Sequence, residues 1–425
     1  MSKKVIISLI IFLGLAVRLW LVPKYIVGDL VLYMDWGRAV WDFGARNLYF
    51  GDIAWEHSAP NYPPLAMVIF AGLDWLWEHK YFLAQAHNVI KIPPAFFIVY
   101  FYKYGNLLLF KLVPTLCDLG VSIIIYKVLL GLTKNTKKAM LGMALYFLNP
   151  IAIFLSGVWG QLDSIIALFG ILAFTSLVKK KFPLAVILFF IGMNIKPNWG
   201  IFIPFFVYMF FALKPKVKDI VLSAVLVVVA YLVLYWPFGG NQTLAFTRDL
   251  FWGRFILPLG TVGKASYSAF NFHTIFLKID RDFYNARILG ILPAFSVGYI
   301  SLIATNFVAY LITRSKKNMY VKVFSGLFVI GLGYFMFGVN MLERYFFPAL
   351  IPLIILGVYN TKLLFRAGLL SLFFFANIIW SFFRRGSDEI DHLFTNYNFA
   401  LIKVVSFLEV VVFVGLTKKL LNEKD

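Results

Sequence analysis

Carboxylates and cations recur in this sequence next to long apolar runs, at points where a membrane-spanning helix would begin or end. Asp29 precedes a helical pattern at residues 30–43, and Asp163 stands near the start of another apolar run. A carboxylate within reach of a hydroxyl can remove its proton as a general base. Lys196 and Arg344 stand at the ends of further runs, where a cation can bind phosphate or anchor a helix at the lipid headgroups. These side-chain types are therefore compatible with two kinds of chemistry, proton abstraction and phosphate binding.

The sequence around Asp29 leaves two roles open for this carboxylate. Apolar and aromatic residues recur at helical spacing through 30–43, which predicts an amphipathic helix lying on the membrane. An Asp just before a helix commonly accepts a backbone N–H as its N-cap, so a structural and a catalytic role both fit Asp29. Asp35, Arg38 and Asp42 share the polar face of the same helix, and a solvated charge pair is the favoured interpretation there.

Four further motifs place polar side chains beside the ends of apolar runs. They are Asn61-Tyr62-Pro63-Pro64, Trp159-Gly160-Gln161-Leu162-Asp163, Lys196-Pro197-Asn198 and Met341-Leu342-Glu343-Arg344-Tyr345. The prolines of the first motif suit a simple helix start. Asp163 could cap the helix that follows it, and Gln161 could bind a sugar hydroxyl. Inside an apolar run, Lys111 and Asp118 lie seven residues apart on one helix face, where a structural ion pair and a function within the membrane are both open.

The composition places these residues in a membrane protein. Of the 425 residues, 61% are hydrophobic and 14% are charged, whereas a soluble globular chain is about 45–50% apolar and about 25% charged. Cys117 is the only cysteine, which excludes an intramolecular disulfide and a cysteine-based zinc site. The sequence contains no Walker loop, His/Glu zinc motif or Ser/His/Asp set. A nucleic-acid-binding role is excluded by the same composition.

Repeated apolar runs of transmembrane length predict an all-α polytopic membrane protein. The runs cover residues 5–22, 64–78, 94–130, 138–156, 162–178, 182–197, 198–213, 218–236, 287–312, 320–338, 345–358, 363–382 and 398–417. The stretch 79–110 is ambiguous between an extra hairpin and a re-entrant segment, so we expect about 12–14 transmembrane helices, with 14 favoured. Bulky residues follow the first run, which is therefore expected to stay as an uncleaved helix.

The net charge of +20 comes mainly from basic residues whose positions along the chain reflect the expected membrane topology. Lysine and arginine cluster in alternate connections, which the positive-inside rule assigns to the cytoplasm. The clusters are Lys3/Lys4, Lys127 to Lys138, Lys179 to Lys181, Lys214 to Lys218, Arg314 to Lys317, Lys362/Arg366 and Lys418/Lys419. Both termini are then cytoplasmic, and two long aromatic loops, 23–63 and 237–286, face outside. Loops of this length suggest a site built on that face of a single membrane domain, 1–425.

The motifs occur in an order that resembles the GT-C glycosyltransferases, over roughly residues 1–350. The similarity is to bacterial and archaeal members with a YPP…WGQxD…KPQ…HERY pattern, and to the eukaryotic glucosyltransferases that use dolichyl-phosphate-glucose. It is carried by Asp29 with the Tyr33 to Trp36 helix, Tyr62-Pro63-Pro64, Lys111 to Asp118, Asn149-Pro150, Trp159-Gly160-Gln161-Leu162-Asp163, Lys196-Pro197 and Glu343-Arg344-Tyr345. Asn198 stands where these proteins usually have Gln, and Leu342 where they usually have His.

The resemblance implies a GT-C-like fold with structured outer loops and an inverting transferase. The enzyme would transfer a hexose from a polyprenyl-phosphate sugar to a lipid-linked glycan or other acceptor on the extracytoplasmic face. Mannose and glucose are the favoured hexoses. The enzyme would be located in the cytoplasmic membrane, or in the endoplasmic reticulum membrane of a eukaryote. Membrane lipids would be further partners of the enzyme. No cofactor is required, although a divalent metal is compatible with the residues present.

The resemblance also assigns roles to individual residues. Asp29 occupies the position of the base. Substrate-binding residues would be Tyr33, Asp35, Tyr62, Gln161, Asp163, Lys196, Asn198, Glu343, Arg344 and Tyr345. Arg254 and Lys264 of the second outer loop are weaker candidates for binding phosphate.

Two other classes of protein remain open at this point. A transporter or flippase of lipid-linked sugars would also combine membrane charges with outer loops, although such proteins usually show repeat symmetry or helices interrupted at the midplane. A non-catalytic assembly subunit would keep the fold and lose the base. The presence of Asp29 argues against the subunit.

Overall fold

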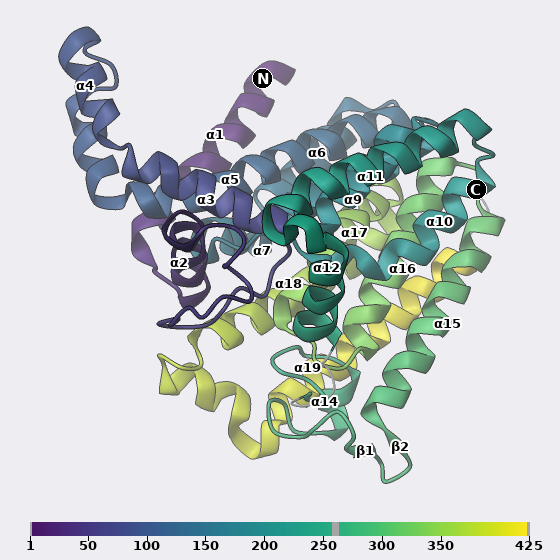
Figure 1. The fold of residues 1–425 in the computed structure, drawn as a ribbon. Coiled ribbons are helices and arrows are strands. Elements are labelled where there is room, and N and C mark those ends of the chain that lie inside the picture. Colours follow the sequence, from purple (N-terminus) through teal and green to yellow (C-terminus); the bar gives the residue numbers. More distant parts are fainter. Residues whose placement is uncertain (1, 257–262, 423–425) are drawn as a thin grey trace.

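The computed structural model describes residues 2–256 and 263–422, with the side chains of 254–256 left out. Most of this described chain is helical (Figure 1). The longer helices are α1 (Lys3–Leu21), α2 (Gly28–Phe43), α3 (Pro64–Glu78), α5 (Ala95–Thr133), α6 (Thr136–Phe147), α8 (Asp163–Val178), α9 (Phe182–Met193), α11 (Val217–Gly239), α15 (Ala294–Ser315), α16 (Met319–Phe337), α17 (Phe347–Tyr359), α18 (Leu364–Phe383) and α19 (Asp388–Asn422).

Short helices, single turns and one small hairpin connect the longer helices. The short helices are α4 (Tyr81–Ile90), α7 (Pro150–Ile153), α10 (Ile203–Ala212), α12 (Thr243–Leu250) and α14 (Phe272–Phe276). The turns are η1 (Val22–Lys24), η2 (Phe154–Trp159), η3 (Pro197–Phe202), η4 (Gly240–Gln242), η5 (Phe251–Ile256), η6 (Glu343–Phe346) and η7 (Thr361–Leu363). Strand β1 (Arg287–Ile288) pairs antiparallel with β2 (Leu292–Pro293). Non-helical residues from Asn396 to Phe399 break α19 into two parts.

The helices confirm the predicted class, an all-α polytopic membrane protein. Within the described residues, seven helices are long and apolar enough to cross a membrane, or eight if α6 and the α7–η2 segment, bent by 42°, form one span. Three shorter apolar helices cover residues 163–178, 182–193 and 197–212. The count of about 12–14 crossings stays a prediction, because it depends on how many of the shorter helices also cross.

The ambiguous stretch 79–110 forms a hairpin of α4 and the first half of α5. Figure 1 shows this hairpin projecting from the body of the molecule at the upper left. None of the residues of α4 is buried, and apolar side chains such as Phe82 and Val89 are exposed on it. Whether this hairpin adds crossings or is a re-entrant segment stays a prediction, because α4, with ten residues, is not among the helices long enough to cross a membrane.

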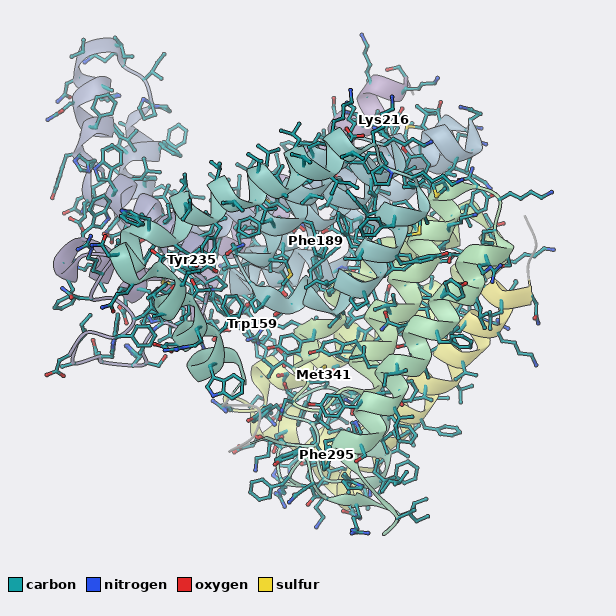
Figure 2. The ribbon with its side chains drawn as sticks, turned by 45° about the vertical axis from the view of Figure 1, so that its right-hand side comes forward. Trp159, Phe189, Lys216, Tyr235, Phe295 and Met341 are labelled. Atoms are coloured by element: carbon teal, nitrogen blue, oxygen red, sulfur yellow. The ribbon has the colours of Figure 1, made fainter. Side chains whose placement is uncertain are left out.

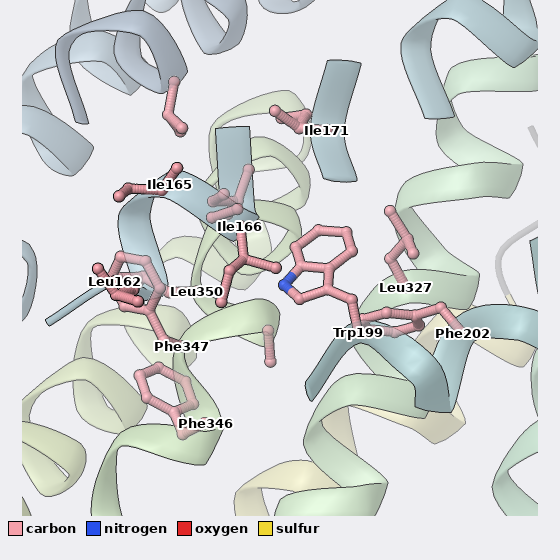
Figure 3. Packing of buried hydrophobic residues seen from close by; sticks show 14 of the residues in the cluster. Leu162, Ile165, Ile166, Ile171, Trp199, Phe202, Leu327, Phe346, Phe347 and Leu350 are labelled. Atoms are coloured by element: carbon pink, nitrogen blue, oxygen red, sulfur yellow. The ribbon is translucent and has the colours of Figure 1, made fainter. Parts of the chain in front are cut away.

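Aromatic and branched side chains pack directly beside the polar motifs. Leu162, next to Asp163, and Phe346, next to Tyr345, lie in one buried cluster with Trp199 (Figure 3). A Cβ atom at Gly170 would overlap the ring of Trp199, so this close contact requires glycine. In a membrane, where lipid tails are as apolar as the core, close packing of this kind is what holds helices together.

A buried ion pair joins α1 to α5. Arg18 Nη2 lies 3.1 Å from Asp118 Oδ2, and both side chains are at most 1% exposed. The other guanidinium N–H groups donate to Ser156 Oγ at 2.9 Å and to the carbonyl of Phe147 at 2.8 Å. The Tyr146 hydroxyl donates to Asp118 Oδ1 at 2.8 Å. Each charge therefore has the hydrogen bonds that a buried ion pair needs to be tolerated.

Lys111 and Asp118 have separate partners, so the predicted structural ion pair between them is wrong. Lys111 Nζ donates to the carbonyls of Val22 at 3.0 Å and Tyr25 at 2.8 Å. Both carbonyls belong to the turn that connects α1 to α2. The pairing fails because each side chain finds a closer partner on α1 or the turn after it. Lys111 fixes the segment that leads to Asp29.

We expect Asn241 to face outside and Lys317 to face the cytoplasm, because the lysine clusters alternate along the chain. Both residues are exposed. A single cysteine placed at either position, in a background with Cys117→Ser, should react with a membrane-impermeant maleimide from opposite sides of sealed cells. Labelling of both cysteines from the same side would refute the assigned topology.

Candidate active site

Two cavities meet at Arg344, where the starts of α2, η3 and η6 approach the end of α18. The first cavity has a volume of about 530 Å³ and the second about 590 Å³. The first is lined by Asp29, Trp159, Glu343, Arg344, Arg384 and Arg385 among others. The second is lined by Tyr62, Lys196, Asn198, Asn340, Arg344 and Tyr345 among others. Trp159, which lines the first cavity, and Met341, which lines the second, are labelled in Figure 2.

Asp29 lies in the first turn of α2 and presents its carboxylate to the first cavity. The N-cap of α2 is Val27, and no side chain caps this end of the helix, so the N-cap interpretation of Asp29 is wrong. Asp29 Oδ2 accepts hydrogen bonds from Gln161 Nε2 and, at 3.2 Å, from Trp159 Nε1. Among the described residues no group donates to Oδ1, and the side chain is 31% exposed. One carboxylate oxygen is therefore held in place while the other is open to the cavity.

The turn at Gly160 explains why Trp159 and Gln161 both reach Asp29. The π-helical turn η2 ends at Gly160, which has a φ of 71°, a left-handed conformation that suits glycine. A Cβ atom at this position would overlap Leu30 of α2. The reversal directs the two flanking side chains toward the same carboxylate. The motif thus positions Asp29, with Gln161 fully buried.

Tyr33 and Tyr62 connect α2 to the loop that begins α3. The Tyr33 hydroxyl lies 3.1 Å from the Tyr62 hydroxyl and 3.3 Å from Gln161 Oε1. The Tyr33 ring stacks on Phe70, with the ring centroids 4.7 Å apart. Burial, together with the neighbouring Tyr62 and Asp29, raises the pKa of Tyr33 well above its ordinary value. Tyr33 therefore stays a neutral hydroxyl that can orient Gln161.

Lys196 and Asp163 form a buried ion pair beside the second cavity. Lys196 Nζ lies 3.1 Å from Asp163 Oδ2, and both side chains are 3% exposed. The N-cap of α8 is Leu162 and no side chain caps it, so the suggested capping role of Asp163 is wrong. The same Nζ lies 5.8 Å from the ring centroids of both Tyr62 and Tyr345. Lys196 is thereby held at the wall of the second cavity.

Arg344 is held between two carboxylates at the wall common to both cavities. Its Nη1 lies 3.0 Å from Glu343 Oε1 and its Nη2 lies 3.6 Å from Asp29 Oδ2. Its Nε is buried and, within the described part of the chain, has no hydrogen-bond partner. Burial works against its charge, yet Glu343 and Asp29 raise the pKa of Arg344 well above its ordinary value. Arg344 is thus a fixed cation with a donor to spare.

Glu343 is the buried counter-ion that fixes Arg344. Its carboxylate accepts hydrogen bonds from the hydroxyls of Ser268 and, at 2.8 Å, Ser381. Burial by itself would raise the pKa of Glu343, but Arg344 and the two serines bring it below its ordinary value. Glu343 therefore remains ionised, and its role is to position the arginine.

Asn198 and Leu342, the two residues that depart from the pattern that the sequence resembles, both line the second cavity. Asn198 Nδ2 is buried and lacks a hydrogen-bond partner among the described residues, so it can donate to a ligand there. Leu342 lines the first cavity as well and brings no polar group to either. Four tyrosines (Tyr62, Tyr267, Tyr334 and Tyr345) and Asn340 supply further polar groups to the second cavity.

Two predicted residues, Asp35 and Lys264, are not brought to the site. Asp35 Oδ2 lies 2.9 Å from His57 Nδ1 in an exposed pair. Lys264 Nζ lies 4.3 Å from the centroid of the Phe283 ring. Lys264 lines neither of the two cavities. The side chain of Arg254 lies outside the described residues.

Two serines and two arginines of the first cavity were not identified from the sequence. They are Ser268, Ser381, Arg384 and Arg385. The two arginines stand where α18 ends, and adjacent arginines after an apolar run were the available signal. The two serines carry no pattern that distinguishes them from other serines.

In the described part of the chain, no three His, Cys, Asp or Glu side chains come together as a metal site would require. The carboxylates of Asp29, Asp163 and Glu343 each face a lysine or arginine instead.

No family model matches the chain, and no curated protein is significantly similar to it. The two cavities and the order of the motifs are therefore the observations from which a function is inferred.

Proposed function

We propose that the protein is an inverting glycosyltransferase of the GT-C type, with its active site at the extracytoplasmic face. It transfers a hexose, mannose or glucose, from a polyprenyl-phosphate carrier to an acceptor hydroxyl. The observation that carries this proposal is the pairing of Asp29 with Arg344 at 3.6 Å where two cavities meet. A base for the acceptor and a cation for the leaving phosphate are the two groups that such a reaction needs.

The two cavities fit the two substrates of a displacement with inversion. In such a reaction the acceptor and the leaving group lie on opposite faces of the sugar ring. The first cavity, which contains the open Oδ1 of Asp29, receives the acceptor. The second cavity, with Lys196 and Asn198 at its wall, receives the donor phosphate. The sugar then lies beside Arg344, which lines both cavities.

The reaction follows from these positions. The acceptor oxygen attacks the anomeric carbon and loses its proton to Asp29 Oδ1, while the bond from that carbon to the phosphate oxygen breaks. The lipid phosphate leaves with the bonding electrons, and its growing charge is met by Arg344 and Lys196. Gln161, Trp159 and Glu343 hold Asp29 and Arg344 before the substrates arrive, so little reorganisation is needed during the reaction.

A direct assay tests the proposal. The purified protein, in lipid nanodiscs, is incubated with a panel of radiolabelled polyprenyl-phosphate hexoses and membrane-lipid extracts. We expect transfer of label to an extract component, with the anomeric configuration opposite to that of the donor. In proteoliposomes, movement of the intact labelled lipid across the bilayer without a new glycosidic bond would support the flippase alternative instead.

Replacing Arg344 by Ala should weaken use of the donor more than replacing Lys362, an exposed residue of the η7 turn. Losing one charge-assisted contact should lower kcat/KM for the donor by about 10–150-fold. Arg344→Lys keeps the charge without the planar fork and should fall between the two. Steady-state transfer assays over a range of donor concentrations measure all three. Equal kcat/KM in the Arg344→Ala and Lys362→Ala proteins would remove the phosphate role.

A further inference from the structure

The second outer loop enters the protein interior beside the candidate active site. All of residues 265–271 except Tyr267 are buried, although connecting loops usually run over the surface because their backbone groups need hydrogen-bond partners. The partners here lie on two other elements. The backbone N–H groups of Tyr267 and Ser268 donate to the carbonyl of Met341 at 3.1 and 3.2 Å. Further hydrogen bonds come from a side chain of α18.

Asn377 of α18 gives both polar atoms of its side chain to this loop. Its Nδ2 donates to the carbonyl of Ser268 at 2.6 Å, and its Oδ1 accepts from the N–H of Phe270 at 2.9 Å. The side chain is fully buried, so water does not compete for either bond. A polar side chain inside a membrane helix is costly unless it is hydrogen-bonded. One amide therefore fixes the backbone on both sides of Ala269.

The backbone that Asn377 fixes carries Ser268, which reaches the active site. The Ser268 hydroxyl donates to Glu343 Oε2, as does the hydroxyl of Ser381 at 2.8 Å. The other carboxylate oxygen, Oε1, lies 3.0 Å from Arg344 Nη1. The direction of the Glu343 carboxylate therefore depends on where Ser268 lies, and the Arg344 guanidinium follows the carboxylate.

We propose that Asn377 is a positioning residue of the active site and that it acts on Arg344 through Ser268. Without the Asn377 amide, the loop and the Ser268 hydroxyl move away from Glu343. The guanidinium then loses its fixed counter-ion at the wall common to the two cavities, and it binds the phosphate of a polyprenyl phosphate less tightly. This inference rests on the proposed function and adds to it a residue outside the motifs and outside residues 1–350, over which the resemblance extends.

Binding of farnesyl phosphate, a short polyprenyl phosphate without a sugar, tests the inference without requiring transfer. Its Kd is measured by isothermal titration calorimetry with the purified protein in nanodiscs of phosphatidylcholine. Asn377→Leu keeps the approximate volume of the side chain and removes both hydrogen bonds. It should raise the Kd by about 5–20-fold, because the Arg344 contact is weakened rather than lost. Asn377→Gln keeps the amide and should recover part of the loss. A defect of folding alone would lower the fraction of protein that binds and leave the Kd unchanged.

Two double variants show whether the effect passes through Ser268. Ser268→Ala should raise the Kd by a factor similar to that of Asn377→Leu. Adding Asn377→Leu to it should then change the Kd by less than about 2-fold, because residues that act through one contact are not additive. In a Ser381→Ala background Asn377→Leu should keep its full effect, because Ser381 reaches Glu343 from α18 without the loop. Multiplied effects of Ser268→Ala and Asn377→Leu would overturn the proposal, as would a Kd that Asn377→Leu leaves unchanged.

Asn306→Leu is the matched control for these variants. The Asn306 amide donates to the carbonyl of Leu302 within its own helix, α15, at 2.9 Å, so this substitution should leave the Kd unchanged. If Asn377→Leu does not fold, Asn377→Ser replaces it in every comparison, because a serine side chain is too short to reach both backbone groups.

The outcomes also separate this inference from the proposed function. In transfer assays Asn377→Leu should raise the KM for the donor by a similar factor and leave the KM for the acceptor as in the wild type. A wild-type protein that binds farnesyl phosphate and transfers no hexose would overturn the proposed function, while the Kd values still decide the role of Asn377. A wild-type protein that does not bind farnesyl phosphate would overturn both, because both require a phosphate site at Arg344.

Discussion

Replacing Asp29 by Asn is expected to lower glycosyl transfer by about 10²–10⁴-fold, the usual contribution of a general base. The substitution preserves the size of the side chain, and its amide oxygen can still accept the hydrogen bonds that Trp159 and Gln161 give to Asp29. What it removes is the open carboxylate oxygen that takes the proton. Because Val27 is the N-cap of α2, loss of helix capping does not enter the comparison. Turnover at saturating donor measures the effect.

Asp35→Asn is the matched control for this prediction. Asp35 lies on the same helix, about 1.7 turns further on, and within the described residues its carboxylate pairs with His57 alone, at an exposed position. Such a surface pair contributes about 0.2–1 kcal/mol to stability, so transfer should persist. If Asp35→Asn abolishes transfer and Asp29→Asn retains it, then Asp35 is the base and the proposed site is incorrect.

The positions of the helices could be predicted because they depend on local patterns. Residues 64–78 were predicted as one apolar run, and α3 has the same limits. The helix at 30–43 was predicted from its spacing, and α2 begins two residues earlier. Hydropathy over a window and the spacing of apolar residues are properties of neighbouring positions, so the sequence contains them directly.

The partners of the charged residues could not be predicted in the same way. Spacing on one helix suggested that Lys111 pairs with Asp118, yet Asp118 pairs with Arg18, 100 residues away in sequence. Asp163 looked like a helix cap and instead pairs with Lys196. Each buried charge takes whichever partner the packing of the helices brings closest, and that packing is not a local property.

Part of the candidate site could be anticipated from motif order alone. Asp29, Gln161 and Arg344 were grouped as candidates, and the side chains of Gln161 and Arg344 both lie against the carboxylate of Asp29. Arg385 was missed because arginines that follow an apolar run, as Arg384 and Arg385 do, are typical of an interfacial anchor. Only the cavity that it shares with Asp29 distinguishes it from such an anchor.

Replacing Asp118 by Leu is expected to lower the free energy of unfolding by about 3–5 kcal/mol, because it leaves the Arg18 guanidinium buried without its counter-ion. Arg18 is 1% exposed and Asp118 is fully buried, so water cannot replace the lost partner. Unfolding of the detergent-solubilised protein, followed by circular dichroism against denaturant, measures the difference. Asp42→Asn is the control, since the Arg38–Asp42 pair is more than half exposed and should contribute less than about 1 kcal/mol.

The double variant Arg18→Met/Asp118→Leu separates a missing counter-ion from a general packing defect. Replacing both members of a buried ion pair by apolar residues of similar volume is often neutral, because the cost of burying the charges disappears together with their attraction. We therefore expect the double variant to recover most of the stability that Asp118→Leu loses. The Ser156 hydroxyl that now accepts from Arg18 also donates to the carbonyl of Ala152, so it keeps a partner in the double variant. A double variant as unstable as the single one would mean that the ion pair itself, with its hydrogen bonds, holds α1 against α5.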